Sequence, residues 1–385
     1  MSEEVREGRF RSLSISGFRR LKEVQLDLRP LTVLIGANGT GKTSVLDVLS
    51  LLARSASGQL GAAISDLGGL PAILTSDRAR QLSLRISHQV IYFQPTEYLL
   101  RLRPAGIAYE IVEETLLRPS DPQLQHIVAS GGDIQYFINA AGQTVRPSWQ
   151  YNGSESALAQ VPRTFQEAED FRGRLGSLSY YHALNVEPRA PIRLPQPMQP
   201  ATLPGGNGED LVSCLFNLRE TQRDRFEAIE DALHAAFPAF ERLDFPPVAA
   251  GTLAMTWREK GFSRPLYMHQ LSEGTLRFLW LATLLQSPGL PALTLLDEPE
   301  VSLHPALLNL LVHLLRKASA RTQLVVATHS DTLIRFLKPE EVVVIDSDDD
   351  GMSTFTWADQ LDLEEWLKEY SLDELWLRGR IGARP

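Results

Sequence analysis

The stretch "GANGTGKT", Gly36 to Thr43, decides the fold of this chain because it fits the pattern GxxxxGK[ST] in full. The apolar run "LTVLI" before it indicates a buried strand, and the pattern "SVLDVLSLLA" after it indicates a helix. A strand, a glycine-rich loop and a helix in this order predict backbone N–H groups that surround phosphate oxygens. The pattern also places Lys42 at the β- and γ-phosphates and Thr43 on Mg²⁺, so we expect ATP and Mg²⁺ as cofactors.

Length and composition are those of an ordinary globular protein. The chain has 385 residues, of which 43% are hydrophobic and 22% are charged, which allows one large domain or two. The N-terminus is polar, and no apolar run approaches the roughly 20 residues that a bilayer requires. The single cysteine, Cys214, excludes an intramolecular disulfide and a cysteine-based zinc site. We expect a cytoplasmic protein without a membrane partner.

The net charge of −9 is unevenly distributed. Residues 341–374 carry twelve acidic residues and one basic residue, whereas the last eleven residues add three arginines. Residues 1–340 therefore have a net charge of only −1. A basic patch on the main body is compatible with this balance, and the acidic segment is poorly suited to a phosphate backbone.

Hydrophobic patterning divides the rest of the chain. Residues 9–35 indicate two strands around a turn and then the strand before the loop, and alternating segments between about residues 80 and 150 indicate antiparallel strands. Residues 186–210 carry six prolines and the turn "GGNG", so they form a loop or linker. The segments "EDLVSCLFNLRE" and "RDRFEAIEDALHAAF" beyond them indicate amphipathic helices.

The second half of the chain carries the other parts of an ATPase. The apolar strand Leu293–Leu296 ends in Asp297 and Glu298, where one carboxylate can hold Mg²⁺ and the next can polarise the attacking water. In "LSEGT", Ser272 can cap a helix whose N-terminus is open to an anion. In "LVVATHS", His329 follows another apolar strand and can hydrogen-bond a γ-phosphate.

The ordered set "GANGTGKT", "LSEGT", "LLDEPE", "SLHP" and "THS" resembles the ABC-type ATPase heads of the SMC and RecF class. It is most similar to the small AAA-like ATPases that are grouped with OLD-family proteins. The resemblance covers residues 9–50 and 265–346 and implies an α/β fold: an ABC-type P-loop ATPase head with a mixed central sheet, an antiparallel β lobe and a helical signature lobe. "LSEGT" stands at the ABC signature, where Glu273 departs from the commoner glycine.

The resemblance also implies a role for each motif residue. Lys42, Glu298 as general base and His329 as switch histidine are the catalytic residues, and Thr43 and Asp297 hold the metal. Ser272 and Gly274 contact the γ-phosphate across a dimer, and Ser302 to His304 form the loop that crosses it. The nucleotide-binding residues of the loop are Gly36, Asn38, Gly39, Thr40, Gly41, Lys42, Thr43 and Ser44.

Several assignments remain open from the sequence. The glutamine that senses Mg²⁺ in the resembling heads has two candidates, Gln94 and Gln135. Arg19 and Arg20 occupy a segment that lies near nucleotide or DNA in those heads, and simple surface arginines fit equally well. We interpret His182 and His304 as packing or capping residues rather than ligands.

The resemblance implies limits as well. SMC-like proteins carry long coiled coils between the loop and the signature, whereas Ser50 to Gln270 shows strands, a proline-rich loop and short helices. OLD nucleases carry a metal-dependent domain after the ATPase, whereas 39 residues follow Asp346 here. We interpret the acidic run "DSDDDG" as a solvated turn.

The sequence thus predicts an ATPase core at residues 1–50 and 265–350. Residues 51–264 form an inserted β lobe and helical region with a loop at 186–210, and residues 351–385 form an acidic C-terminal tail. We expect a Mg²⁺-dependent ATP hydrolase that forms a homodimer on ATP and serves DNA maintenance or antiphage defence. Its partners would be a separately encoded effector, such as a nuclease, and DNA. The alternative is a nucleotide-gated scaffold with little turnover.

Overall fold

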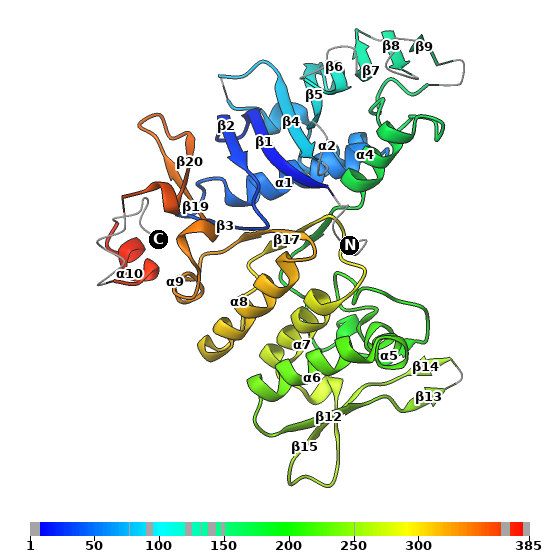
Figure 1. Cartoon of the computed structure of the whole chain (residues 1–385), viewed down its shortest axis with the longest axis vertical. Coiled ribbons are helices and arrows are strands. Elements are labelled where there is room, and N and C mark those ends of the chain that lie inside the picture. Colours follow the sequence, from blue (N-terminus) through cyan, green and yellow to red (C-terminus); the bar gives the residue numbers. More distant parts are fainter. Residues whose placement is uncertain are drawn as a thin grey trace.

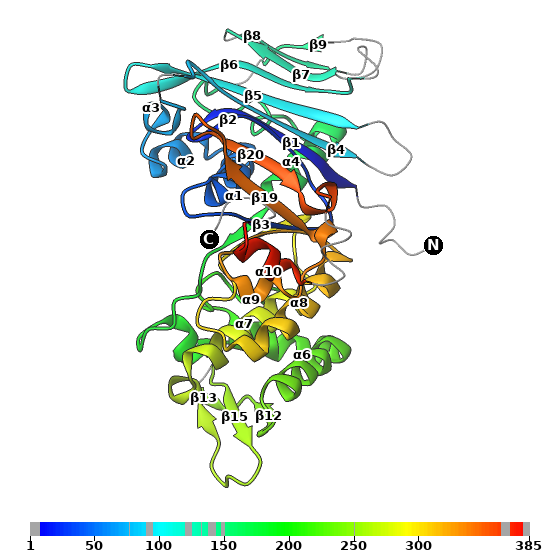
Figure 2. The ribbon, with the colours of Figure 1, turned by 90° about the vertical axis from the view of Figure 1, so that its left-hand side faces the viewer.

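The computed structural model describes residues 8–76, 78–89, 95–119, 125–131, 133–137, 144–147, 151–249, 251–362 and 370–379. Three layers follow one another along the long axis of the molecule (Figure 1). An antiparallel sheet lies at one end, a mostly parallel central sheet lies in the middle, and a helical region lies at the other end. The side view shows the same order of layers (Figure 2).

The strands are β1 (Arg9–Phe18), β2 (Leu21–Asp27), β3 (Leu31–Ile35), β4 (Leu82–Gln89), β5 (Thr96–Ala105), β6 (Ala108–Leu117), β7 (Gln125–Ser130), β8 (Asp133–Phe137), β9 (Thr144–Val145), β10 (Ser179–Tyr181), β11 (Gln196–Pro197), β12 (Phe240–Asp244), β13 (Pro247–Ala249), β14 (Thr252–Leu253), β15 (Thr256–Glu259), β16 (Leu266–Tyr267), β17 (Leu293–Asp297), β18 (Gln323–Ala327), β19 (Val342–Ser347) and β20 (Ser353–Trp357).

The helices are α1 (Lys42–Ala56), α2 (Leu60–Asp66), α3 (Leu70–Ile73), α4 (Gln166–Gly176), α5 (Leu211–Thr221), α6 (Arg223–Ala236), α7 (Glu273–Gln286), α8 (Pro305–Ser319), α9 (Asp331–Ile334) and α10 (Leu372–Leu377). No helix in the described part of the chain is long and apolar enough to cross a bilayer.

The central sheet has the order β10-β17-β18-β3-β19-β20, in which only β20 runs antiparallel to its neighbour. Successive residues of its strands belong to two different cores. Val33 of β3 and Leu324 of β18 pack toward the helical region, whereas Leu34 and Val325 pack toward the antiparallel sheet. Because both faces are covered, the strands are continuous apolar runs, which explains the sequence "LTVLI".

Helices cover the two faces of the central sheet in different ways. α1 lies between the two large sheets, where Val45 and Leu49 are fully buried in one core (Figure 1). α7 and α8 cover the opposite face, where Leu279 and Leu311 are fully buried in the other core. The mixed α/β fold predicted from the sequence is therefore confirmed.

The antiparallel sheet has the order β2-β1-β4-β5-β6-β7-β8-β9. It confirms the prediction of antiparallel strands between residues 80 and 150. β1 and β2 form a hairpin whose turn is Arg19 and Arg20, with Phe18 paired to Leu21. This turn brings the two arginines beside the glycine-rich loop, as described below.

The helical region contains the two amphipathic helices predicted from the sequence, α5 and α6. Residues 186–210 connect it to the core without an α-helix, as predicted from their prolines. Two small sheets, β11-β14-β13 and β12-β15-β16, were not predicted. Their strands are two to five residues long, which is too short for alternation to stand out in the sequence.

The structure differs from the predicted division of the chain at two places. β10 lies in the predicted insertion, yet it pairs with β17 and extends the central sheet. β20 lies in the predicted acidic tail, yet it pairs with β19 along five residues. α10 also packs into the core, where Leu375 and Trp376 are fully buried. The residues that the structure describes at 351–362 and 370–379 are thus part of the ATPase core.

Ion pairs balance some of the acidic charge of residues 341–374. The pairs join Glu341 to Arg316 at 2.6 Å, Asp350 to Arg78 at 2.9 Å and Asp359 to Arg29 at 2.7 Å. Asp348 organises the turn between β19 and β20, since its Oδ1 accepts hydrogen bonds from Asp350 N and Met352 N. The predicted acidic turn is confirmed, and the described residues contain no cluster that could hold a metal ion there.

A buried carboxyl ties the antiparallel sheet to the loop before α4. Glu114 is fully buried and accepts hydrogen bonds from Tyr98 Oη at 2.9 Å, Ala157 N at 2.7 Å and Leu158 N at 2.8 Å. Burial raises the pKa of Glu114 from 4.5 to about 7, although the two backbone N–H groups act in the opposite direction.

We expect Glu114 to make stability fall as pH rises. Between pH 4.5 and about 7 the unfolded chain ionises this carboxyl while the folded chain keeps its proton. The free energy of unfolding should therefore fall by roughly 3 kcal/mol across this window because of Glu114 alone. Urea unfolding of Glu114→Gln at pH 5 and pH 7.5 should show a smaller decrease than the unsubstituted protein. Glu113→Gln, on the same strand with a half-exposed carboxylate, serves as the control; equal slopes in all three proteins would contradict the assignment.

Candidate functional site

The glycine-rich loop connects β3 to α1 at the carboxyl edge of the central sheet. Gly36 and Gly41 have φ values of +153° and +113°. A Cβ at Gly36 would lie 2.2 Å from the carbonyl oxygen of Ile345, and one at Gly41 would lie 2.9 Å from Ser353 Oγ. Only glycine fits such close approaches at positive φ, so neighbouring chain segments require these two glycines.

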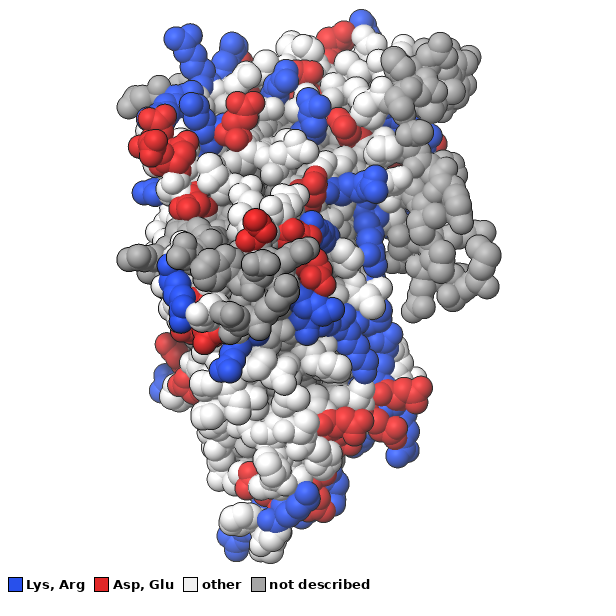
Figure 3. Space-filling model, turned by 60° about the vertical axis from the view of Figure 1, so that its left-hand side comes forward, with Lys and Arg blue, Asp and Glu red and all other residues white. Residues whose placement is uncertain are grey.

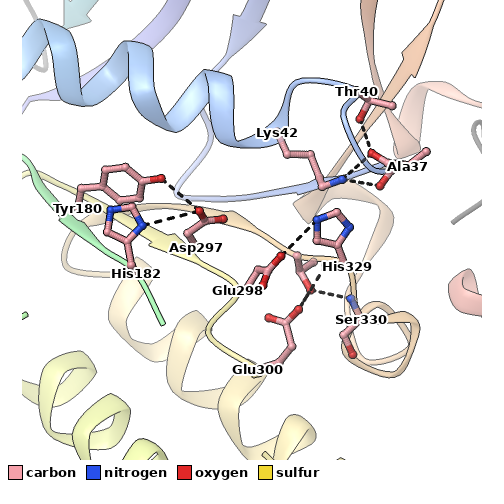
Figure 4. A network of polar contacts seen from close by, with 12 residues as sticks. Ala37, Thr40, Lys42, Tyr180, His182, Asp297, Glu298, Glu300, His329 and Ser330 are labelled. Atoms are coloured by element: carbon pink, nitrogen blue, oxygen red, sulfur yellow. Dashed lines mark hydrogen bonds and ion pairs between the residues drawn. The ribbon is translucent and has the colours of Figure 1, made fainter. Parts of the chain in front are cut away.

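Lys42 lies at the centre of the loop with 4% of its surface exposed. Its Nζ donates hydrogen bonds to the carbonyl oxygens of Gly36 at 2.6 Å and Ala37 at 2.8 Å (Figure 4). Thr40 Oγ1 donates to the same Ala37 oxygen at 2.9 Å. Burial lowers the pKa of Lys42 to about 8, and the charges of Glu298 and Asp297 oppose this shift. The ammonium group is thus held in the loop, between the loop carbonyls and two carboxylates.

A cavity of about 300 Å³ opens in front of the loop. It is lined by Arg19, Arg20, Gly39, Gly41, Lys42, Thr43, Ser44 and His329. Two arginines, Lys42 and the N-terminus of a fifteen-residue helix face this space, and none of the described residues that line it is a carboxylate. Such an environment favours an anion with several negative charges, such as a triphosphate.

Arg19 and Arg20 both line this cavity, beside the glycine-rich loop. Arg19 has a φ of +47° and pairs with Asp47 of α1 at 2.6 Å. The same guanidinium lies 3.4 Å from Ser44 Oγ. The hairpin turn is therefore fixed to the first turns of α1.

Two carboxylates lie beside the cavity, at the end of β17. Asp297 is the last residue of the strand, and Glu298 follows it with a φ of +49°. His329, just after β18, places its Nε2 3.3 Å from Glu298 Oε1 (Figure 4). Burial and the charge of Lys42 hold the pKa of His329 below its ordinary value, so the imidazole is neutral at pH 7.

Tyr180, to which the sequence analysis assigned no role, and His182 lie beside Asp297. Tyr180, on β10, donates its hydroxyl to Asp297 Oδ2 at 3.2 Å, and His182 Nδ1 lies 3.9 Å from the same oxygen (Figure 4). The His182 side chain is 67% exposed, and its ring packs against that of Tyr180 with 4.1 Å between the ring centroids, which is compatible with its interpretation as a packing residue. The signal was present in the sequence, because "SYYH" ends a short strand with polar residues in the same way as "LTLLDE".

Of the two candidate glutamines, the structure describes only Gln135. Gln135 lies on β8, far along the antiparallel sheet, and its amide donates to Asp133 at 3.3 Å. Gln94 lies outside the described residues. The described neighbours of Asp297 are Tyr180 on β10 and His182 just after this strand.

The signature residues lie outside the cavity of their own chain. Ser272 caps α7 as predicted, since its Oγ accepts a hydrogen bond from Thr275 N at 3.2 Å, and its side chain is exposed. Gly274 packs beside the loop that follows Glu298, because a Cβ there would lie 2.9 Å from the carbonyl oxygen of Ser302. In the same loop His304 caps α8 through a hydrogen bond from Ala306 N, which confirms its predicted capping role.

The residues of this site fit ATP and Mg²⁺. The cavity offers cations and helix N–H groups for phosphates, and the hydroxyl of Thr43 lies on its wall. Asp297 is close enough to Lys42 to affect its pKa, so a carboxylate stands next to the phosphate space. A hydroxyl and a carboxylate are oxygen ligands of the kind that Mg²⁺ prefers beside substrate phosphates.

Comparison with protein families agrees with this site. Residues 9–113 match the family described as "AAA ATPase domain", and residues 141–335 match the family described as "AAA domain, putative AbiEii toxin, Type IV TA system". The second match covers more than half of the chain. The class is thus that of AAA and SMC-like ATPases. The chain belongs to the family of AAA domains matched by residues 141–335.

Comparison with solved structures shows the fold of an SMC head domain. The chain matches an SMC head bound to the C-terminal winged-helix domain of ScpA, with 17% identity, a TM-score of 0.52, and coverage of 90% of this chain and 97% of that one. It also matches the ScpA-bound SMC head of Pyrococcus furiosus, with 14% identity, a TM-score of 0.51 and coverage of 94% and 98%. The match to the SMC head of Pyrococcus yayanosii has 10% identity and a TM-score of 0.51, and it covers 94% of this chain and 99% of that one. No curated protein sequence matches this chain.

Lys42→Ala is expected to weaken ATP binding about 10- to 100-fold, because it removes a charged donor from the phosphate space. The strand and helix around the loop should remain folded, since a lysine is not part of the hydrophobic core. Isothermal titration with ATP and Mg²⁺ measures the change. Lys22→Ala, at an exposed position of β2, is the matched control and should bind ATP normally. Equal affinities of the two variants would refute the assignment of the loop.

Proposed function

We propose that this protein is an ATP-hydrolysing switch that forms a homodimer when ATP binds. The observation that carries the proposal is the separation of two half-sites. Lys42, Thr43 and His329 line one cavity, whereas Ser272 and Gly274 lie outside it at the exposed start of α7. A second copy that places its signature over the cavity would complete the site.

Within one chain, the loop would bind the triphosphate and the strand ends would act on it. Thr43 and Asp297 would hold Mg²⁺, which neutralises charge on the β- and γ-phosphate oxygens when it is bound. Tyr180 donates a hydrogen bond to Asp297 Oδ2 and so fixes the orientation of that carboxylate.

His329 and Glu298 form a pair that ATP can separate. In this structure His329 Nε2 is directed at Glu298 Oε1 at 3.3 Å. A γ-phosphate in the cavity offers His329 a second acceptor, because the same imidazole lines the cavity wall. Once His329 turns to the phosphate, Glu298 is free to accept a proton from the attacking water. This order of events would couple the arrival of ATP to the activation of the base.

The comparisons with known proteins support a biological setting for this switch. The matched family carries a toxin–antitoxin system in its description, and two of the matched SMC heads are bound to ScpA. Both support a switch that acts through a separately encoded partner, in defence or in DNA maintenance. The alternative, a nucleotide-gated scaffold, differs in turnover. ATP hydrolysis by the isolated protein would favour the switch, and tight binding without hydrolysis would favour the scaffold.

At the hairpin turn Arg19 is paired with Asp47 beside the cavity, whereas Arg20 is exposed, so DNA binding at this turn would use Arg20 rather than Arg19. On the face drawn in Figure 3, basic side chains gather near the middle of the molecule and acidic ones are interspersed among the others. The surface is therefore mixed in charge. This arrangement is compatible with a local contact to nucleic acid and with a protein partner.

Glu298→Gln should bind ATP with little change in affinity but hydrolyse it at least about 100-fold more slowly, because an amide cannot accept the proton of the attacking water. The variant should accumulate as an ATP-bound dimer. Light scattering with and without ATP measures its mass, and copurification from cells identifies the partner. A monomer under both conditions would count against the dimer.

Ser272→Arg should separate binding from catalysis. Ser272 does not line the cavity of its own chain, so the affinity for ATP should stay within about threefold. An arginine at this exposed cap would obstruct a facing nucleotide and abolish turnover. Ser371→Arg, at the start of α10, is a control cap position away from the signature. If Ser272→Arg loses ATP binding itself, the signature acts within one chain and the dimer is refuted.

A further inference from the structure

Glu300 lies in a turn whose backbone is strained on both sides. Glu298 and Ser302, two residues before and two residues after it, have φ values of +49° and +61° although neither is glycine. Each such residue costs roughly 1 kcal/mol or more. The turn Glu298–Ser302 therefore keeps its shape only because neighbouring groups hold it.

The carboxylate of Glu300 is one of these groups. Its Oε1 accepts hydrogen bonds from the Thr328 hydroxyl and from the backbone N–H of His329 at 3.3 Å (Figure 4). Thr328 is fully buried, and its Oγ1 in turn accepts a hydrogen bond from Ser330 N at 3.0 Å. Glu300 thus connects the turn after β17 to the segment that carries His329 after β18.

The second carboxylate oxygen of Glu300, Oε2, is incompletely satisfied. Oε2 is buried and has no hydrogen-bond partner among the described residues. Burial raises the pKa of Glu300, and the charge of Glu298 adds to this shift. An incompletely satisfied buried carboxyl lowers stability, and an apolar side chain of similar size would pack here at lower cost. An apolar side chain could not accept the hydrogen bonds that the carboxyl receives from Thr328 and His329.

The other end of the turn reaches the signature. Leu303 N donates to the carbonyl oxygen of Glu300 at 3.0 Å, so the backbone continues directly into the loop Ser302–His304. The carbonyl oxygen of Ser302 lies so close to Gly274 that a Cβ there would be 2.9 Å away. The turn therefore contacts the first residues of α7, beside the exposed Ser272.

We propose that Glu300 is a positioning residue that couples the nucleotide site of a chain to the signature of the same chain. The proposal rests on the proposed function, in which that signature serves the second nucleotide of the dimer. When His329 moves from Glu298 to a γ-phosphate, its backbone N–H and Thr328 transmit the change to Glu300. The turn then shifts Ser302 against Gly274. ATP bound to one chain thereby places the signature of that chain correctly for the ATP bound to the second chain. The rate of hydrolysis then depends cooperatively on the ATP concentration.

The test compares Glu300→Ala with Glu300→Gln. The glutamine keeps an oxygen that can accept from Thr328 and from His329 N, so its turnover and Hill coefficient should stay within about twofold of the unsubstituted protein. The alanine removes the acceptor and should lower turnover about tenfold. The affinity of isolated chains for ATP should change less than about twofold, because Glu300 does not line the cavity. The Hill coefficient of Glu300→Ala should fall to about one.

Thr328→Val removes the same hydrogen bond from the other side and keeps the test decisive if Glu300→Ala does not fold. It should also lower the Hill coefficient, and the double variant should be no worse than the more impaired single variant. Glu341→Ala is the control, because Glu341 is a carboxylate held by Arg316 away from the site. It should lower the melting temperature without changing the Hill coefficient.

Two outcomes would overturn the coupling. One outcome is that the Hill coefficient of ATP hydrolysis is the same in Glu300→Ala and Thr328→Val as in a cooperative unsubstituted protein. The other is a loss of ATP affinity in these variants equal to their loss of turnover, which would make Glu300 a part of the binding site. Absence of ATP hydrolysis or of an ATP-dependent dimer in the unsubstituted protein would be a failure of the proposed function instead.

Discussion

The parallel pairing of β3, β18 and β17 is the constraint on which the site depends. In this register Leu34 lies opposite Ala327, and Ala327 lies opposite Asp297. The three strands end at the same edge of the sheet, so the glycine-rich loop, His329 and the two carboxylates meet although they are distant in sequence. The pairing is held mainly by apolar residues buried on both faces, and the backbone of Glu298 extends it by donating to the carbonyl oxygen of Ala327 at 2.9 Å. Packing thus places the chemistry.

Sequence reasoning succeeded where a motif and a long apolar run coincide. The loop at Gly36–Thr43, the cap at Ser272 and the strand ending in Asp297 all lie beside or within segments made mostly of apolar residues. At these positions the hydrophobic pattern predicts the strand or helix, and the motif predicts the chemistry. The helices α5 and α6 were predictable for the same reason, because eleven to fourteen residues contain several periods of the amphipathic repeat.

The remainder could not be predicted because it depends on distant pairing. β10 has three residues, and only its parallel contact with β17 brings Tyr180 and His182 to Asp297. β20 was hidden by the acidic residues around it, although "STFTW" is rich in strand-forming residues. The sequence analysis assigned no role to Glu300, because its contacts with Thr328 and His329 depend on the pairing of β17 with β18.

Ser353, on β20, supports the glycine-rich loop although it lies more than 300 residues after it in the sequence. Its N–H donates to the carbonyl oxygen of Arg20 at 3.0 Å and its hydroxyl donates to that of Thr40 at 2.5 Å, so β20 supports the glycine-rich loop from behind. During synthesis, residues 36–43 leave the ribosome when most of the chain is still to be made. The loop lacks this support until residue 353 has emerged. A growing chain would therefore complete the support of its glycine-rich loop only after residue 353 has been made.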